Sequence, residues 1–235
     1  MSLSQAFSIN ELGRIVRTSQ KSIVSQLETK PIIVNNYEAG VSGQVGRLVH
    51  YDVAIYESRS ELSASCRTLP SGMFEIVRAP ERIRGYELAV DVTPVRLLAV
   101  GGSYSYLEGK ADGTNNGNYE TYLGGDRIGT PKTTAYMRVQ PNNRLSVNAL
   151  RTGNRNRFSP ATNGLFAYGQ GPVRAHTLLN VGGSYQLTAK VVLSPGVENL
   201  LNTDYYPAIS QWAARAADYI KGTGRRGMLT FNYRW

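Results

Sequence analysis

The chain has 235 residues, 18% of them charged, and its 26 Lys and Arg against 17 Asp and Glu give a formal net charge of +9. This basic excess favours a polyanionic partner such as nucleic acid, lipopolysaccharide or an anionic ligand. A single cysteine, Cys66, excludes a disulfide framework and a thiolate-rich metal site, and no apolar run approaches the roughly 20 residues of a transmembrane helix.

The N-terminal segment begins like a strand and then changes character. Its first six residues contain neither a basic region nor an apolar region, so no signal peptide is expected there. We expect the chain to start inside a strand at residues 1–7. From Ser8 to Val16, capping-box spacing before an apolar run predicts a short helical turn within a loop.

Beyond this segment the dominant pattern is alternation of apolar and polar side chains. Successive side chains of a strand point to opposite faces, so a period of two predicts strands with one apolar and one polar face. In chain order the predicted strands cover residues 49–55, 86–92, 98–106, 145–149, 179–186 and 228–235.

The connections between these strands alternate between short and long. Turn residues such as Pro, Gly and Asn mark short turns at 45–46, 93–94, 141–143 and 187–189. Long polar connections are predicted at roughly 58–80, 108–131, 158–174 and 199–224, and Cys66 falls in the first of them. This order predicts an antiparallel meander with every tight turn at one end, which is typical of outer-membrane barrels.

The composition of the two strand faces separates a membrane barrel from a soluble sandwich. The polar face is rich in Gly, Ser, Ala, Asn and Gln, and the apolar face ends in Tyr and Trp. A soluble β-sandwich would instead carry Lys and Glu on its outer face. The pattern favours an all-β fold of about ten strands with a polar interior and an aromatic girdle. A small stand-alone β-barrel and a soluble β-sandwich binding module stay open as alternatives.

Six short segments, spread in order along the chain, resemble segments of TonB-dependent outer-membrane receptors. The segment at 196–207, Gly-Val-Glu-Asn-Leu-Leu-Asn-Thr-Asp-Tyr-Tyr-Pro, resembles the family's G-V-E-N-L-x-N-x-D-Y, which closes the penultimate strand and opens the last extracellular loop. Residues 222–226 resemble the G-x-G-R before the last strand, and 231–235 resemble the aromatic terminus. The other similar segments lie at 4–8, 36–41 and 76–88.

This resemblance implies a ferric-siderophore receptor, whose fold is a 22-stranded barrel filled by an N-terminal plug and powered through TonB. It implies that residues 1–235 are the C-terminal portion of that barrel, with short periplasmic turns and long extracellular loops. The signal peptide, the TonB box and the plug domain are not expected in this chain. We therefore expect a fragment from a truncated or split gene or a late start, which would be unable to transport alone. The intact receptor would lie in the Gram-negative outer membrane.

No group of residues predicts a catalytic site, a metal site or a bound cofactor. His50 and His176 lie on different predicted strands, and neither has Asp or Ser at a spacing typical of a triad. The glycines at 169–171 and 222–224 lack the Lys-Ser/Thr of a phosphate loop, so turn glycines are the simpler interpretation. The chain is expected not to be an enzyme.

Basic residues gather in three places that the topology assigns to the extracellular rim. There they could meet lipopolysaccharide phosphates or an anionic ferric-siderophore; equally, they could be solvated or paired with Glu81, Asp126 and Asp218. Nucleic acid is not expected, because the aromatics are predicted on the face opposite the charges. The clusters are Arg78, Arg82, Arg84; Arg151, Arg155, Arg157; and Lys221, Arg225, Arg226.

Aromatic residues of the last long loop are the other candidates for ligand contact. They are Tyr205, Tyr206, Trp212 and Tyr219, which join Arg155 and Arg157 as candidate ligand-binding residues. The alternative is that these aromatics pack within the loop or belong to the girdle.

Overall fold

The computed structural model describes residues 1–8, 31–68, 74–114, 116–124, 128–142, 145–154, 173–212 and 220–235, with backbone only for 62–68, 74–78, 145–154, 209 and 212. The chain divides into two compact units. The first unit comprises residues 1–39, 55–85 and 108–123, and the second comprises 40–54, 86–107 and 124–235.

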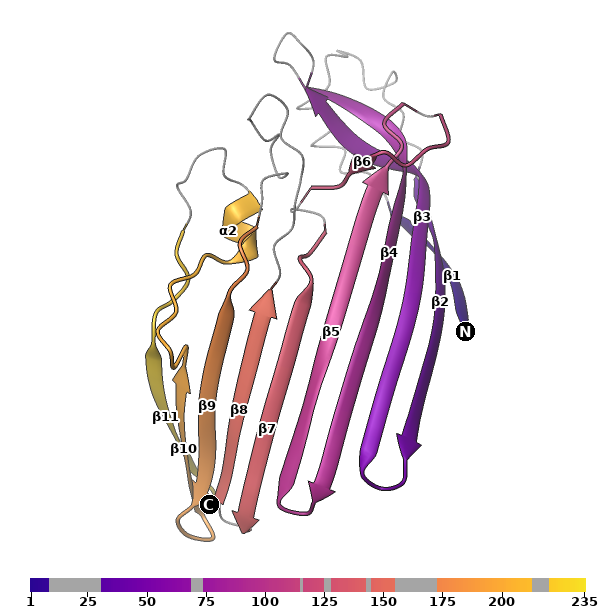
Figure 1. Cartoon of the computed structure of the whole chain (residues 1–235). Coiled ribbons are helices and arrows are strands. Elements are labelled where there is room, and N and C mark those ends of the chain that lie inside the picture. Colours follow the sequence, from indigo (N-terminus) through magenta and orange to yellow (C-terminus); the bar gives the residue numbers. More distant parts are fainter. Residues whose placement is uncertain are drawn as a thin grey trace. The chain divides into compact units, whose positions relative to one another are not determined.

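The strands follow one another in chain order within one antiparallel sheet, β1-β2-β3-β4-β5-β7-β8-β9-β10-β11, with β6 beside β5 off this path (Figure 1). A five-residue helix, α2 (Ala208–Trp212), lies between β10 and β11. The strand bounds are β1 (Ser2–Ser8), β2 (Ile32–Val45), β3 (Val49–Thr68), β4 (Phe74–Val95), β5 (Leu98–Ala111), β6 (Thr121–Tyr122), β7 (Lys132–Asn142), β8 (Leu145–Asn154), β9 (Thr177–Gln186), β10 (Val191–Glu198) and β11 (Arg226–Tyr233).

The register confirms the alternation read from the sequence. In the second unit Leu193 pairs with Phe231, and Val100 pairs with Met137, so apolar side chains of neighbouring strands share one face. On the opposite face Ser103 pairs with Thr134, and their hydroxyls lie 2.5 Å apart. We call these the apolar face and the polar face.

The apolar face is not covered by a second layer of structure within the described residues. Leu229 and Phe231 on β11 are 68% and 62% exposed. Among the described residues, few hydrophobic side chains are buried. They are Ala79, Ala111, Leu123, Ile128 and Val173. A β-sandwich buries one face of each sheet against the other, whereas the described strands form a single sheet. The sheet therefore does not have the sandwich architecture.

An aromatic group stands on the apolar face of the second unit. The ring of Tyr86 on β4 stacks on Tyr106 of β5 at 5.3 Å between centroids, and it lies 5.8 Å from Tyr104. Tyrosines grouped on the apolar face of a sheet are typical of the aromatic girdle of a membrane barrel. None of the helices in the described part of the chain has the length and apolar character needed to cross a membrane.

Two expectations about the connections were wrong. Residues 58–68 and 74–80, predicted as loop, are strand, because β3 extends to Thr68 and β4 starts at Phe74; Cys66 therefore lies in β3. These strands have 20 and 22 residues, well above the usual length of a strand. Where both faces of a strand meet similar surroundings its side chains need not alternate, so the pattern that signals a strand is lost.

The turn expected at 93–94 lies instead at Arg96 and Leu97, and Pro94 is still within β4. Thr93 retains a ladder bond, its N–H donating to Leu48 O at 2.8 Å, and a strand end tolerates the missing N–H of Pro94. The turns between β2 and β3, β4 and β5, and β9 and β10 lie at one end of the second unit, as expected (Figure 1). The predicted helical turn at 8–16 lies outside the described residues, apart from Ser8 itself.

Candidate functional site

The connection from β10 to β11 is organised around one asparagine. Asn199 directly follows β10 and has φ of +49°, a left-handed conformation that Asn tolerates better than most residues. Its backbone N–H donates to Asn180 Oδ1 at 2.8 Å, and its Oδ1 accepts from the Thr203 N–H at 2.8 Å. Its Nδ2 donates to Thr203 O at 3.0 Å and to Thr223 O at 3.3 Å. One 3% exposed side chain thus joins the start and the end of the connection.

A second asparagine and a glycine close the connection further along. Asn202, with φ of +52°, accepts the Arg225 N–H on its Oδ1 at 3.0 Å. The Gly222 N–H donates to Tyr205 O at 2.8 Å, and any Cβ at Gly222 would collide with the Tyr205 ring. The ring therefore needs glycine at this position.

The short helix α2 contributes a fully buried amide. Gln211 is 1% exposed; its Oε1 accepts the Arg174 N–H at 2.8 Å and its Nε2 donates to Tyr206 O at 2.7 Å. The segment before β9 is thereby fastened to the β10–β11 connection. Buried polar groups of this kind are strongly stabilising only when both ends are paired, as they are here.

His176, just before β9, packs against the same connection. Its ring stacks on Tyr205 at 4.6 Å between centroids, and its Nδ1 is buried with no hydrogen-bond partner among the described residues. We call the assembly the loop clasp: Arg174, His176, Asn199, Asn202, Tyr205, Gln211 and Gly222.

Two titratable groups of this region have shifted pKa values. Burial lowers the pKa of His176 below its ordinary value of 6.5, so the imidazole is neutral at neutral pH. The Lys221 Nζ lies 3.1 Å from Asp204 Oδ2, and this hydrogen bond raises the pKa of the lysine. The loop clasp is thus neutral inside, with a charged pair at its edge.

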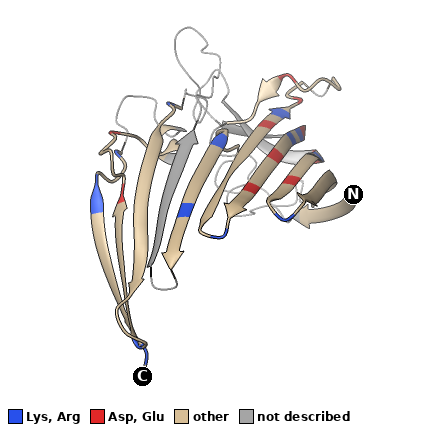
Figure 2. Cartoon of the chain, turned by 60° about the horizontal axis from the view of Figure 1, so that its bottom comes forward, with Lys and Arg blue, Asp and Glu red and all other residues tan. Residues whose placement is uncertain are grey.

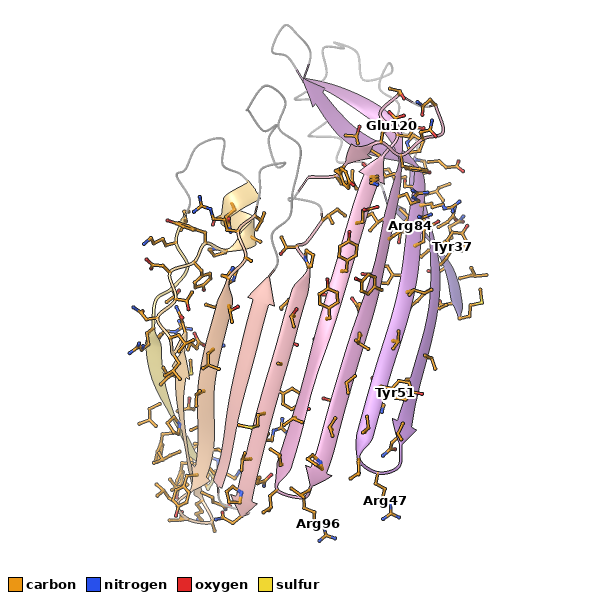
Figure 3. The ribbon with its side chains drawn as sticks, in the orientation of Figure 1. Tyr37, Arg47, Tyr51, Arg84, Arg96 and Glu120 are labelled. Carbon is orange, nitrogen blue, oxygen red and sulfur yellow. The ribbon has the colours of Figure 1, made fainter. Side chains whose placement is uncertain are left out.

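The first unit presents an arginine pair of a different kind. Arg59 on β3 and Arg84 on β4 both donate to the single carboxylate of Glu57, which leaves one positive charge in excess. The arginine side chains are 53% and 52% exposed (Figure 3 labels Arg84). An exposed guanidinium with donors to spare can bind a phosphate or carboxylate with two parallel hydrogen bonds.

Two further cations of the first unit rest on aromatic rings. The Arg82 guanidinium lies 4.5 Å above the ring centroid of Tyr119. The Lys110 Nζ lies 4.7 Å from the centroid of Tyr122 and 3.3 Å from Glu108 Oε1. Charges and aromatics therefore share contacts here, contrary to the expectation that they lie on opposite faces.

The polar face of the second unit carries a polar network and an open hollow. The Tyr136 hydroxyl donates to Asp91 Oδ1 at 2.5 Å, and Gly101 leaves the room that this pair needs, because a Cβ there would collide with both. The hollow, about 360 Å³, includes one basic and two acidic residues, Lys132, Asp52 and Glu87. It is also lined by Ala54, Leu88, Ala89, Ser103, Tyr104, Ser105 and Thr134.

The predicted site residues have different outcomes. Tyr205 is part of the loop clasp, and Tyr206 supplies a carbonyl to it, so both contribute to loop packing. Trp212 ends α2, and its side chain is outside the description. Tyr219, Arg155 and Arg157 lie outside the described residues, as do Asp126 and Asp218, which were expected to pair with arginines.

The observed charge pairs use acids that were not anticipated. Arg84 pairs with Glu57, Arg226 with Glu198 at 2.6 Å, and Lys221 with Asp204. Glu81, which was expected to pair with an arginine, is 4% exposed and belongs to none of these three pairs. Gln211 and His176 were also missed as members of the loop clasp, and no local signal could have revealed partners so distant in the sequence.

Residues 2–200 match the family model described as "TonB dependent receptor-like, beta-barrel". Among solved structures, the copper transporter OprC is similar with a TM-score of 0.79 and 16% identity over 99% of this chain and 36% of that chain. The ferripyoverdine receptor of the outer membrane of Pseudomonas aeruginosa has values of 0.71 and 15% over 98% of this chain and 30% of that chain. The ferric-catecholate import receptor Fiu from E. coli K12 has values of 0.67 and 18% over 98% and 32%. The chain spans about a third of the length of these structures, and at such identities the similarity establishes the fold.

Proposed function

Because the chain belongs to the TonB-dependent receptor β-barrel family, we propose that it forms the C-terminal part of the barrel wall of an outer-membrane receptor that imports ferric-siderophore complexes. The observation that carries the proposal is the single antiparallel sheet with an exposed apolar face and a polar face. In such a barrel the apolar face meets lipid and the polar face lines the interior. The tight turns are then periplasmic and the long loops extracellular.

The ligand class is supported by relatives and by charge. Fiu is a ferric-catecholate import receptor and the Pseudomonas receptor is bound to ferripyoverdine, whereas OprC transports copper. A siderophore complex is commonly anionic, and the loop end of this chain offers cations such as Lys221 and Arg225 beside the loop clasp. The proposed contacts are the predicted set: Tyr205, Tyr206, Trp212, Tyr219, Arg155 and Arg157.

The remaining partners belong to the whole receptor. TonB is proposed to act on the whole receptor; because this chain spans about a third of the length of the similar structures, it is proposed to be incompetent for transport by itself. Arg59 and Arg84 are proposed to hold lipopolysaccharide phosphates, because each keeps donors beyond those used by Glu57. No nucleic-acid partner is proposed.

Detergent dependence tests the membrane reading. We expect the refolded chain to stay dispersed with β-sheet circular dichroism only in detergent, because its exposed apolar face needs a lipid-like partner. A monodisperse monomer in plain buffer would contradict the proposal and favour the soluble binding module.

Ligand titration tests the transport reading. Fluorescence quenching with a ferric catecholate should saturate, whereas copper(II) alone should give no saturable quenching. Saturable copper binding without ferric-catecholate binding would contradict import of a ferric siderophore and favour copper transport.

A further inference from the structure

The tight-turn end of the second unit carries a basic residue at each place the structure describes. Arg47 lies in the β2–β3 turn, Arg96 in the β4–β5 turn and Lys190 in the β9–β10 turn, while Arg234 follows β11. The Arg234 N–H donates to Lys190 O at 2.8 Å, so the last two lie side by side. Figure 2 shows basic residues at these turns, and Figure 3 shows Arg47 and Arg96 pointing away from the strand ends.

No acidic residue opposes these cations locally. The segments 44–49, 93–98, 187–191 and 232–235 contain neither Asp nor Glu. The nearest acids along β3 and β4 are engaged, since Asp52 lies 3.1 Å from His50 and Asp91 accepts the Tyr136 hydroxyl. All four cations are exposed, and none of them forms an ion pair with another described residue.

Arg47, Arg96 and Arg234 each have a large exposed apolar neighbour in the chain. Leu48 follows Arg47 and is 53% exposed, and Trp235 follows Arg234 and is wholly exposed. Val95 and Leu97 flank Arg96 in the same way. A cation beside an apolar side chain suits the boundary of a bilayer, where the apolar group enters the lipid and the charge meets the headgroups.

We propose that Arg47, Arg96, Lys190 and Arg234 form a basic turn band that binds the phosphates of an anionic glycerophospholipid. The inference rests on the proposed function, because the barrel orientation places this band at the inner leaflet of the membrane. The basic turn band is continuous with the apolar face, because Leu187 at the β9–β10 turn and Tyr233 on β11 are exposed next to it. This continuity favours a lipid over a soluble acidic partner. Each Lys or Arg near an anionic membrane surface raises the binding constant for that surface by about fivefold.

Trp235 provides a local reporter for the test. The chain contains two tryptophans, so Trp212→Phe leaves Trp235 as the sole one. The full chain is refolded into bilayers of phosphatidylcholine with 20% phosphatidylglycerol, in which only one lipid carries brominated acyl chains. Bromine quenches tryptophan fluorescence on contact. The loss of Trp235 fluorescence with each brominated lipid, divided by the fraction of that lipid in the bilayer, therefore reports which lipid lies beside the band. If Trp212→Phe does not fold, the same signal is the difference between the parent chain and Trp235→Phe.

We expect brominated phosphatidylglycerol to quench Trp235 several-fold more, per molecule, than brominated phosphatidylcholine. Replacing all four cations by Gln should abolish this preference. A matched variant that loses four charges elsewhere, Lys110→Gln, Lys221→Gln, Arg225→Gln and Arg226→Gln, should retain it. Millimolar glycerol phosphate and an acidic peptide should not compete.

Four results would overturn the proposal. Equal quenching by both lipids would do so, as would a preference that survives the fourfold Gln variant. Full competition by glycerol phosphate or the peptide would assign the band to a soluble anion or an acidic protein instead. Absence of quenching by either lipid would likewise place Trp235 away from the acyl chains and overturn the lipid-bound band, whereas failure of the proposed function is detected separately, by a chain that stays dispersed without detergent.

Discussion

The imidazole of His176 stacks on the ring of Tyr205 with 4.6 Å between centroids, although the two residues belong to different connections of the sheet. This contact ties the approach to β9 to the connection that follows β10. It also makes the loop clasp sensitive to the charge of one half-buried ring.

Acid should loosen the loop clasp. Burial lowers the pKa of His176 below 6.5, so the opened connection takes up a proton more readily than the closed one. Closure is therefore fully stable above about pH 6.5 and weakens as pH falls from there toward the depressed pKa. Hydrogen exchange of residues 199–212, corrected for intrinsic rates, should show more opening at pH 5 than at pH 7.5. His176→Phe keeps an aromatic ring and should remove the pH dependence; an unchanged profile would refute the role of His176.

Removing the buried amide should weaken the same region. Gln211→Ala removes the hydrogen bonds that the Gln211 amide makes with the Arg174 N–H and the Tyr206 carbonyl, and each lost hydrogen bond costs about 0.5–1.5 kcal/mol. Proteolysis between β10 and β11 should become about ten times faster or more. Gln44→Ala, at an exposed position on β2, is the matched control and should leave the cleavage rate unchanged.

A methyl group at Gly222 should disrupt the loop clasp, whereas one at Gly224 should not. Alanine at Gly222 collides with the Tyr205 ring, while at Gly224 the nearest atom, Asn202 Oδ1, is 3.4 Å from the added Cβ. Overpacking of this kind costs about 1–3 kcal/mol. Thermal unfolding in detergent should show a lower midpoint for Gly222→Ala only. Combining it with Tyr205→Ala should relieve the collision, and an additive loss in the double variant would contradict the steric explanation.

Neutralising Glu57 should strengthen the binding of phosphorylated glycolipid. Glu57→Gln withdraws the carboxylate shared by Arg59 and Arg84, which frees both guanidiniums for phosphate. The stability effect should be small, about 0–1 kcal/mol, because the pair is near the surface. Retention of lipopolysaccharide should rise severalfold in Glu57→Gln and fall in Arg84→Gln. Dephosphorylated glycolipid serves as the control, and an equal rise with it would exclude a phosphate contact.

The strands were largely predictable, whereas their lengths and the loop clasp were not. Segments such as 98–106 and 179–186 form strands with one apolar and one polar face, and these two different faces require the alternation that identifies them. Residues 58–68 have no such requirement, so their sequence resembles a loop.

Within the candidate site, sequence reasoning located the connection but not its contacts. The segment 196–207 was recognised by its resemblance, and its asparagines suit the left-handed conformations found at Asn199 and Asn202. The buried role of Gln211 depends on Arg174, a partner that only the folded chain brings near. Arg84 was predicted at the loop end, but its partner Glu57 and the second arginine, Arg59, both lie on β3 and were not anticipated.

Asn199 has a mechanical consequence for the last loop. Its single side chain bonds to Thr203 and Thr223, and its backbone bonds to Asn180 on β9. Because these hydrogen bonds share one residue, displacement of Asn199 would loosen both ends of the connection at once. We therefore expect residues 199–205 and 220–225 to open as one cooperative unit.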